Sequence, residues 1–326
     1  MKIHRILCAT AVLCTGLFSH AAMAADQYPS RPITLIVPWG AGGGTDTLAR
    51  TFAEELQKEL KQTVNVVNQT GGGGVIGHSA ISKARTDGYT LGVGTVEITT
   101  YRALGQADLG ADSFTILRRL AALPGGITVN SKQPWATAAD FVEDIRKQPE
   151  TTYSASGCSL GCSWQLALAG LLDRSGIDPK RVRFIPSTGG AQALQEVVAG
   201  GVTVYPGSLG EGKSLVQADM VKQLVVMSGS RLPSEPNVPT VKEALGFDWE
   251  AGSWFVFLGP KDLPDALRKK IEAAAEKASR GESYRKFLKD RGFLALDEAP
   301  DQSKTIMLAE EENSKALIAK LGLGKN

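Results

Sequence analysis

The stretch ITLIVPWGAGGGTD, residues 33–46, decides the fold class. An apolar run at 33–38 leads through glycines into 45–61, where apolar side chains recur with the period of a helix. The same order is repeated after an expected strand at 64–67, and a third strand is expected at 89–94. Strands that alternate with glycine loops and helices predict a parallel sheet covered by helices on both faces.

A second unit of the same kind begins after Pro124-Gly125-Gly126. We expect its strands at 152–154, 182–185, 202–205 and 223–227, and its helices at 162–175 and 191–199. A last strand is expected at 253–258, followed by helices at 264–280, 284–291 and 300–321. Two α/β units with a helical tail indicate two lobes.

Length and composition agree with a globular protein of two domains. The chain has 326 residues, of which 43% are hydrophobic and 21% are charged. A single core rarely grows beyond about 250 to 300 residues, and this composition excludes a disordered chain. Beyond the N-terminal segment, the chain has no run of roughly 18 apolar residues that would span a membrane.

The N-terminus has the parts of a secretory signal. Lys2 and Arg5 precede an apolar run at 6–18, and Ala22-Met23-Ala24 matches a signal peptidase site. A membrane anchor is the alternative, but the apolar run is too short to span a bilayer. We therefore expect residues 1–24 to be a signal peptide that is removed on export.

The exported chain is electrically neutral, because residues 1–24 carry two of the 36 basic residues and none of the 34 acidic ones. A neutral chain without a basic run argues against nucleic acid as a partner. Its single histidine, His78, leaves no cluster with zinc-ligand spacing, so neither a metal nor a cofactor is expected. In an oxidising compartment, Cys158 and Cys162 are expected to form a disulfide.

Residues 157–161, Gly-Cys-Ser-Leu-Gly, match the G-x-S-x-G pattern of a hydrolase nucleophile. A serine nucleophile needs a general base, and in that fold the histidine follows the serine. Because His78 precedes Ser159, a small-residue entrance to a helix explains the pattern better. A periplasmic hydrolase that uses Ser159 remains an alternative.

Two nucleotide-binding patterns also occur. Residues 207–214 match the P-loop G-x-x-x-x-G-K-S, but no acidic residue ends a neighbouring expected strand to hold magnesium. Residues 72–77 match G-x-G-x-x-G, but they follow the second expected strand instead of the first. We therefore expect neither ATP hydrolysis nor dinucleotide binding.

Several expected strands end in loops rich in glycine, serine and threonine that lead into helices. Open α/β sheets bind ligands at the carboxyl ends of their strands, where free helix N–H groups and the helix dipole favour anions. This pattern predicts a small carboxylate bound between two lobes.

Six short segments resemble signature blocks of the tripartite tricarboxylate transporter receptors, which are Bug-type periplasmic solute-binding proteins. The blocks occur in order over nearly all of the exported chain. They are YPSRPI (28–33), VPWGAGGGTD (37–46), GGVIG (73–77), DGYTL (87–91), PNVPT (236–240) and SWF (253–255).

The resemblance implies a two-lobed type II periplasmic binding protein, in which each lobe is a mixed, mostly parallel sheet flanked by helices. The first lobe would comprise 25–124 and 253–326, and the second 125–252. Such a receptor binds a small mono- or dicarboxylate in the periplasm and delivers it to membrane permease subunits. It would be a monomer without enzyme activity. A binding protein that signals to a membrane kinase is the alternative use of the same cleft.

In the family, the loop after the first strand wraps a ligand carboxylate. Its glycines allow a close approach and leave several backbone N–H donors, while Asp46 is expected to orient the next helix. If Glu97 faces the cleft, it would pair with a ligand ammonium and repel a second carboxylate. The first-lobe candidates are Trp39, Ala41, Gly42, Gly43, Thr45, Gly74 and Glu97.

The second lobe departs from the family pattern. Cys158-Ser159-Leu160 lengthens a loop that is usually compact, Gln165 stands where a histidine is common, and Pro206-Gly207-Ser208 replaces an expected aspartate. Different groups are therefore expected to hold the far end of the ligand. The candidates are Ser156, Ser159, Gln165, Thr188, Gly189, Gly207 and Ser208.

Overall fold

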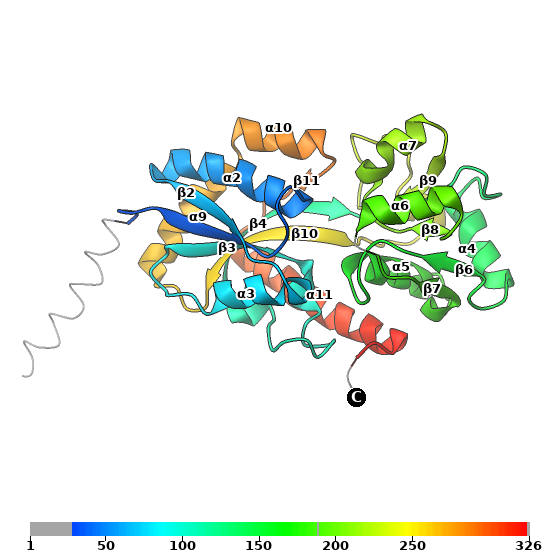
Figure 1. Ribbon diagram of the computed structural model, residues 1–326, viewed down its shortest axis with the longest axis horizontal. Coiled ribbons are helices and arrows are strands. Elements are labelled where there is room, and N and C mark those ends of the chain that lie inside the picture. The colour runs from blue at the N-terminus through cyan, green and yellow to red at the C-terminus, as the bar shows by residue number, and fades with distance from the viewer. Residues whose placement is uncertain (1–27, 188, 325–326) are drawn as a thin grey trace, which may run out of the picture.

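Two β-sheets divide the protein into two lobes, which lie side by side along its longest axis (Figure 1). The structure is a computed structural model and describes residues 28–187 and 189–324. The expected signal at 1–24 and the candidate ligand residue Thr188 lie outside the described residues. Each lobe is an α/β layer structure, as the sequence predicts.

The first lobe is built on a six-stranded sheet with the strand order β11-β4-β10-β3-β1-β2. β1 pairs in parallel with β2 and β3, whereas β10 runs antiparallel to β3 and β4, so the sheet is mixed. Its strands are β1 (Ile33–Val37), β2 (Val64–Asn68), β3 (Thr90–Thr95), β4 (Phe114–Pro124), β10 (Gly252–Pro260) and β11 (Leu294–Ala295).

Helices cover both faces of this sheet because its central strands are apolar on both sides. Along β10, Phe257 packs in the cluster beneath α2, with its ring centroid 5.2 Å from that of Phe52. The adjacent Val256 packs in the opposite cluster, which includes Met307 of α11. The helices are α2 (Gly44–Leu60), α3 (Val75–Ser82), α9 (Asp265–Ser279), α10 (Glu282–Asp290) and α11 (Pro300–Leu321), with 3-10 turns η1 (Gly72–Gly74), η2 (Val96–Thr99) and η3 (Ala111–Ser113).

The second lobe has a five-stranded sheet with the order β7-β6-β8-β5-β9. β6 is parallel to β7 and β8, and β5 is antiparallel to β8 and β9. The strands are β5 (Gly126–Asn130), β6 (Tyr153–Ala155), β7 (Val182–Phe184), β8 (Val204–Tyr205) and β9 (Val221–Val226). The helices are α4 (Ala138–Lys147), α5 (Ser163–Arg174), α6 (Gly190–Ala199), α7 (Lys213–Gln217) and α8 (Val241–Leu245), with 3-10 turns η4 (Pro179–Arg181) and η5 (Leu209–Gly212).

The chain crosses between the two sheets twice at one place. β4 ends at Pro124 and β5 begins two residues later, while the return crossing enters β10 at Gly252. The backbone N–H of Gly125 donates to the carbonyl of Ala251 over 2.9 Å, so the two crossings lie side by side. Such paired crossings are a geometry about which lobes open and close.

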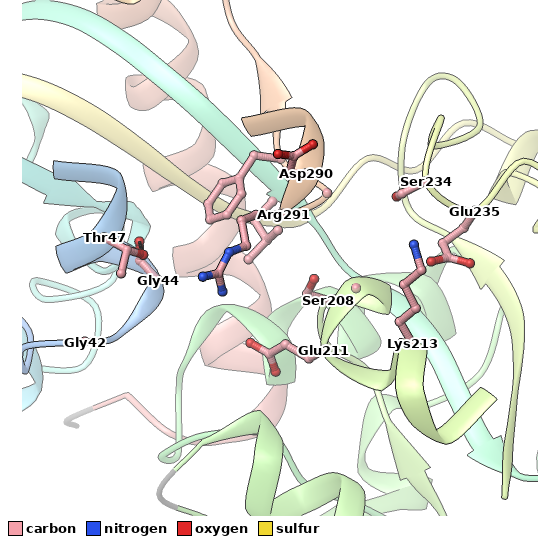
Figure 2. A pocket seen from close by; sticks show the side chains of 14 residues that line it. Gly42, Gly44, Thr47, Ser208, Glu211, Lys213, Ser234, Glu235, Asp290 and Arg291 are labelled. Carbon is pink, nitrogen blue, oxygen red and sulfur yellow. Dashed lines mark hydrogen bonds between the residues drawn. The ribbon is translucent and has the colours of Figure 1, made fainter. Parts of the chain in front are cut away.

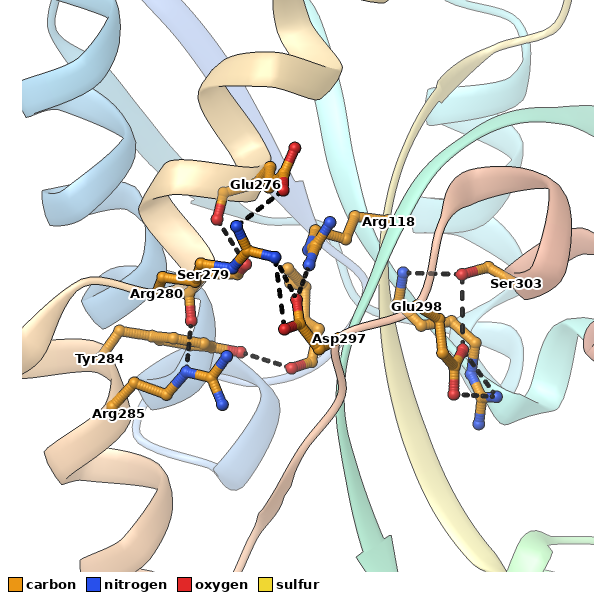
Figure 3. Close-up of polar contacts among 11 residues, drawn as sticks. Arg118, Glu276, Ser279, Arg280, Tyr284, Arg285, Asp297, Glu298 and Ser303 are labelled. Carbon is orange, nitrogen blue, oxygen red and sulfur yellow. Dashed lines mark hydrogen bonds and ion pairs between the residues drawn. The ribbon is translucent and has the colours of Figure 1, made fainter.

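The C-terminal helix α11 also contacts both lobes. Just before α11, Asp297 pairs with Arg118 of β4 and with Arg280, and Glu298 lies 3.2 Å from Arg119, so the segment is fixed to the first lobe (Figure 3). At the far end of α11, the Lys320 ammonium lies 2.7 Å from the carboxylate of Asp173 in α5.

Most predicted helices and strands are present, and their ends lie within a few residues of the predicted ends. The first and last residues of α11 are those predicted. The strands and helices that the sequence did not predict include β4, β5, β11, α4, α7 and α8. Among the described residues, every helix is too short or too polar to cross a bilayer.

Candidate functional site

Among the cavities lined by residues of both lobes, two border the loop that follows β1. The Trp39 cavity has a volume of about 290 Å³. The Arg291 cavity has a volume of about 260 Å³ (Figure 2). The Trp39 cavity is lined by Trp39, Gly73, Glu97, Thr100, Leu104, Gln106, Cys158, Ser159, Leu160, Gly161, Cys162 and Ser187. The Arg291 cavity is lined by Gly42, Gly44, Thr47, Leu123, Ser208, Gly210, Glu211, Lys213, Ser234, Glu235, Asp290, Arg291, Gly292 and Phe293.

The glycine loop after β1 borders both cavities and is organised by Asp46. This buried carboxylate accepts hydrogen bonds from the backbone N–H of Gly42 at 2.8 Å and from the side-chain amide of Asn68 at 2.9 Å. Arg50 lies 2.9 Å from the same carboxylate. Burial acts to raise the pKa of Asp46, but these hydrogen bonds and the Arg50 charge outweigh it and lower the pKa. Asp46 therefore orients the loop that precedes α2, whereas the sequence predicts that it orients the helix itself; no side chain among the described residues caps α2.

These contacts correct the expectation that the backbone N–H groups of the glycine loop are free to bind a ligand. The N–H of Gly42 is used by Asp46 and is not free for a ligand, although Gly42 lines the Arg291 cavity. The N–H groups of Gly44 and Thr45 belong to the first turn of α2, where a helix has no internal acceptor for them. The anion-binding capacity of the loop therefore lies at the start of α2.

Trp39 is half-buried at the edge of its cavity. Its indole N–H donates to the hydroxyl of Thr95 over 3.1 Å, and the ring packs against the core of the first lobe. The carbonyl of Trp39 accepts a hydrogen bond from Asn68 over 2.8 Å. One face of the indole therefore borders the space between the lobes, while its N–H is fixed by the hydrogen bond to Thr95 of β3.

His78 is a structural residue behind this wall. Its Nε2 accepts a hydrogen bond from the backbone N–H of Thr95 at 3.2 Å, so the proton lies on Nδ1, which is 2.7 Å from the hydroxyl of Tyr101. The Tyr101 hydroxyl donates in turn to the carbonyl of Gly73 at 2.9 Å. Complete burial lowers the pKa of His78 to about 3, so the ring is neutral. Both ring nitrogens are occupied, and His78 cannot act as a base for Ser159.

Glu97 faces the gap between the lobes. It lines the Trp39 cavity and also a smaller cavity of about 90 Å³ beside α5 and α11. Its Oε2 atom is buried and has no hydrogen-bond partner among the described residues. Burial raises the pKa of this carboxyl, and hydrogen bonding to Thr95 only partly opposes the shift.

The loop between β6 and α5 carries the predicted disulfide, which the structure confirms. Cys158 is bonded to Cys162, and their Cα atoms are 6.2 Å apart. The side-chain oxygen of Gln165 accepts the N–H of Gly161 over 2.7 Å, so Gln165 supports the loop from its buried position. Ser159 is exposed and lines the Trp39 cavity.

The Arg291 cavity contains charges of both signs. Figure 2 shows Arg291 and Glu211 extending into the space between the lobes from opposite sides. Glu211 accepts a hydrogen bond from the buried hydroxyl of Tyr205 at 2.5 Å. Burial raises the pKa of Glu211, and that hydrogen bond only partly opposes the shift. Within the described part of the chain, neither Arg291 nor Lys213 forms an ion pair.

The structure brings five predicted ligand residues to the cavity walls, namely Trp39, Gly42, Glu97, Ser159 and Ser208. The exposed Ala41 and Gly43 and the half-buried Thr45 belong to the same loop as two of these, and the half-buried Gly189 precedes α6. The remaining described candidates are buried and line neither cavity: Gly74, Ser156, Gln165 and Gly207.

Sequence reasoning missed the charged wall formed by Arg291, Glu211 and Glu235. Lys213 stands out in the sequence only as a P-loop lysine, and nothing marks Arg291, which follows α10 far along the chain. Across residues 28–187 and 189–324, no group of three or more histidine, cysteine, aspartate or glutamate side chains is placed to hold a metal ion.

Two α/β lobes, paired crossings and ligand-sized cavities between the lobes define a solute-binding protein. The model of the tripartite tricarboxylate transporter family receptor matches residues 48–323, and the chain belongs to this family. The predicted family and the two-lobed type II binding-protein fold are therefore confirmed.

Relatives match the chain over almost its full length. A Pseudomonas sp. (strain P51) protein from the tcbD-tcbE intergenic region is 28% identical over 312 residues, which cover 94% of this chain and 91% of that protein. A TctC solute binding protein from Polaromonas, solved without ligand, is 30% identical with a TM-score of 0.78 and coverages of 90% and 99%. An R. palustris protein solved with adipate is 26% identical, with a TM-score of 0.75 and coverages of 91% and 99%.

Proposed function

We propose that this protein is a periplasmic receptor that captures a small organic carboxylate between its lobes and delivers it to the permease subunits of a tripartite tricarboxylate-type transporter. The glycine loop at the start of α2 is the observation that carries the proposal. It is exposed in the gap and held from behind by Asp46, whose charge is balanced by Arg50. First-turn N–H groups and the helix dipole stabilise an anion there. The adipate-bound relative supports the same ligand class.

The proposed ligand contacts come from both lobes. In the first lobe, 25–124 and 253–326, the loop of Trp39, Ala41, Gly42, Gly43 and Thr45 surrounds the carboxylate. In the second lobe, 125–252, the exposed Ser159 and the cavity-lining Ser208 approach the ligand. Four candidates are buried and line neither cavity, and we propose that they support the walls from behind: Gly74, Ser156, Gln165 and Gly207. Glu97, Thr188 and Gly189 complete the proposed set.

We also propose that the protein is not an enzyme and reaches the periplasm through a cleaved signal at 1–24. Ser159 has no available histidine base, because His78 is buried, neutral and hydrogen-bonded at both nitrogens. Lys213 belongs to the short helix α7 and faces a cavity between the lobes. We propose a monomer, since residues of both lobes of one chain line the proposed ligand site.

A thermal-shift screen of mono- and dicarboxylates against the purified protein tests the binding role. A ligand at 100 times its Kd adds about 2.7 kcal/mol to the free energy of unfolding. Deletion of the gene should then reduce cellular uptake of the acid that binds, and the wild-type gene should restore it. A flat screen would contradict carboxylate binding, whereas binding with unchanged uptake would contradict transport.

A further inference from the structure

The backbone of Glu97 is fixed at the wall of the Trp39 cavity. Its carbonyl accepts hydrogen bonds from the backbone N–H and the hydroxyl of Thr100, both at 2.9 Å, which closes the short turn η2. Two residues before Glu97, Thr95 is fixed by the neutral ring of His78 and by the Trp39 indole. The fold therefore fixes the backbone position from which the Glu97 carboxylate extends.

The protein supplies no cation to this carboxylate. Arginine, lysine and histidine are absent from the described residues that line the Trp39 cavity and from those that line the smaller cavity behind it. The other ionisable groups facing this region are Tyr101, Glu250 and Glu310, none of which is positive. Glu310 already accepts a hydrogen bond from the Trp254 indole. The Oε2 atom of Glu97 thus remains without a partner among the described residues.

A buried carboxylate oxygen without a hydrogen-bond partner, such as Oε2 of Glu97, is unfavourable unless something in the site compensates for it. A protonated amine on the ligand would supply both the missing charge and the missing hydrogen-bond donors. A second ligand carboxylate in the same place would instead meet a like charge in a poorly solvated cavity, which costs affinity. Glu97 therefore discriminates between two classes of small acids.

We propose that the Trp39 cavity takes an amino acid, whose ammonium group pairs with Glu97 while its carboxylate lies beside Trp39, where the glycine loop borders the same cavity. This inference rests on the proposed function and narrows its ligand class. Glu97 is the specificity-determining residue, and it disfavours dicarboxylates that carry no amine.

Matched triplets of acids test this assignment by titration calorimetry on the full exported chain. Members of each triplet differ only at carbon 2, which carries hydrogen, hydroxyl or ammonium. Propanoate, lactate and alanine form one triplet; succinate, malate and aspartate a second; glutarate, 2-hydroxyglutarate and glutamate a third. In at least one triplet the ammonium member should bind tenfold or more tightly than the hydrogen member.

The variant Glu97→Gln keeps the shape of the side chain but removes its charge. We expect it to reduce the ammonium preference to less than threefold. Glu250→Gln is the control, because Glu250 lines only the smaller cavity and should leave the preference unchanged. The affinity ratio of the wild-type protein is a second readout that does not depend on folding of the variant.

Equal or tighter binding of the hydrogen members in every triplet that binds would overturn the assignment, as would an unchanged preference in Glu97→Gln. In both outcomes a carboxylic acid still binds, so the proposed function survives. Absence of binding by all acids, in these triplets and in the wider screen, would overturn the proposed function together with this inference.

Discussion

The carboxylate of Asp46 accepts a hydrogen bond from the backbone N–H of Gly42 over 2.8 Å, from a position four residues further along the chain. The contact joins the first turn of α2 to the glycine loop that borders both cavities. Because of this contact, the N–H of Gly42 is not available to a ligand in the space between the lobes. The loop is thus organised before a ligand arrives, which reduces the ordering cost of binding.

Asp46→Asn should weaken carboxylate binding at least tenfold and lower the free energy of unfolding by roughly 1 to 3 kcal/mol, because an amide cannot accept hydrogen bonds at both ends. The folded-state pKa of Asp46 is lowered, so its stabilisation is present at neutral pH and is lost as pH falls through that pKa. Denaturant unfolding and calorimetry measure both effects. Asp248→Asn, which alters an exposed ion pair with Lys242, is the control and should change neither quantity appreciably.

Gly42→Ala should reduce ligand affinity at least tenfold by placing a methyl group in the gap. Gly42 has a φ of +80° and no atom within 4 Å of the point that an alanine methyl would occupy, and Gly200 at the end of α6 has a φ of +81° and equally open space. Both alanine variants should lose roughly 1 kcal/mol of stability through left-handed backbone strain. Only Gly42→Ala should affect calorimetric binding, and equal affinities in the two variants would refute the assigned role of the loop.

Replacing both Cys158 and Cys162 by serine should affect binding more than folding. The loop closed by the disulfide is so short that the chain-entropy relation gives roughly 2 kcal/mol of stabilisation. The same loop lines the Trp39 cavity, so its relaxation should weaken binding at least tenfold. Mild reduction of the wild-type protein should reproduce both effects. A large loss of stability with unchanged affinity would assign the disulfide to the fold instead of the site.

His78 should remain neutral through the physiological pH range. Its folded-state pKa is about 3, against about 6.5 in an unfolded chain, so protons bind preferentially to the unfolded state between these values. This residue should therefore remove up to about 1.4 kcal/mol of stability per pH unit as pH falls below 6.5. NMR of the imidazole ring between pH 5 and 8 should show no titration. A ring signal that titrates near pH 6.5 would contradict the buried, hydrogen-bonded state.

The early part of the chain was predictable because its local signals agree with its fold. The apolar run before Trp39, the glycines after it and the helical period of α2 each indicate what the structure contains. β4 was not predictable in this way, since Arg118 and Arg119 interrupt its apolar pattern. Both are buried in the fold, and their partners Asp297 and Glu298 lie about 180 residues later in the chain.

The candidate site was predictable only where ligand-facing residues belong to a local motif. Gly42, Trp39 and Ser159 stand in recognisable loops, and the structure places them at the cavity walls. Arg291 and Glu211 line the same cavity from opposite lobes only because the chain crosses twice between the lobes. The spacing of these two residues in the sequence does not predict that they line one cavity.

Recognition of a carboxylate at the glycine loop is tested most directly by titration calorimetry. The tightest-binding acid is compared with the analogue in which the loop-facing carboxylate is replaced by a primary amide. Micromolar binding corresponds to about 8 kcal/mol, and each hydrogen bond to a charged group contributes about 1.5 to 3 kcal/mol. We expect the acid to bind with a micromolar Kd and the amide to bind at least 100-fold more weakly. An amide that binds within threefold of the acid would contradict recognition of a carboxylate at the glycine loop.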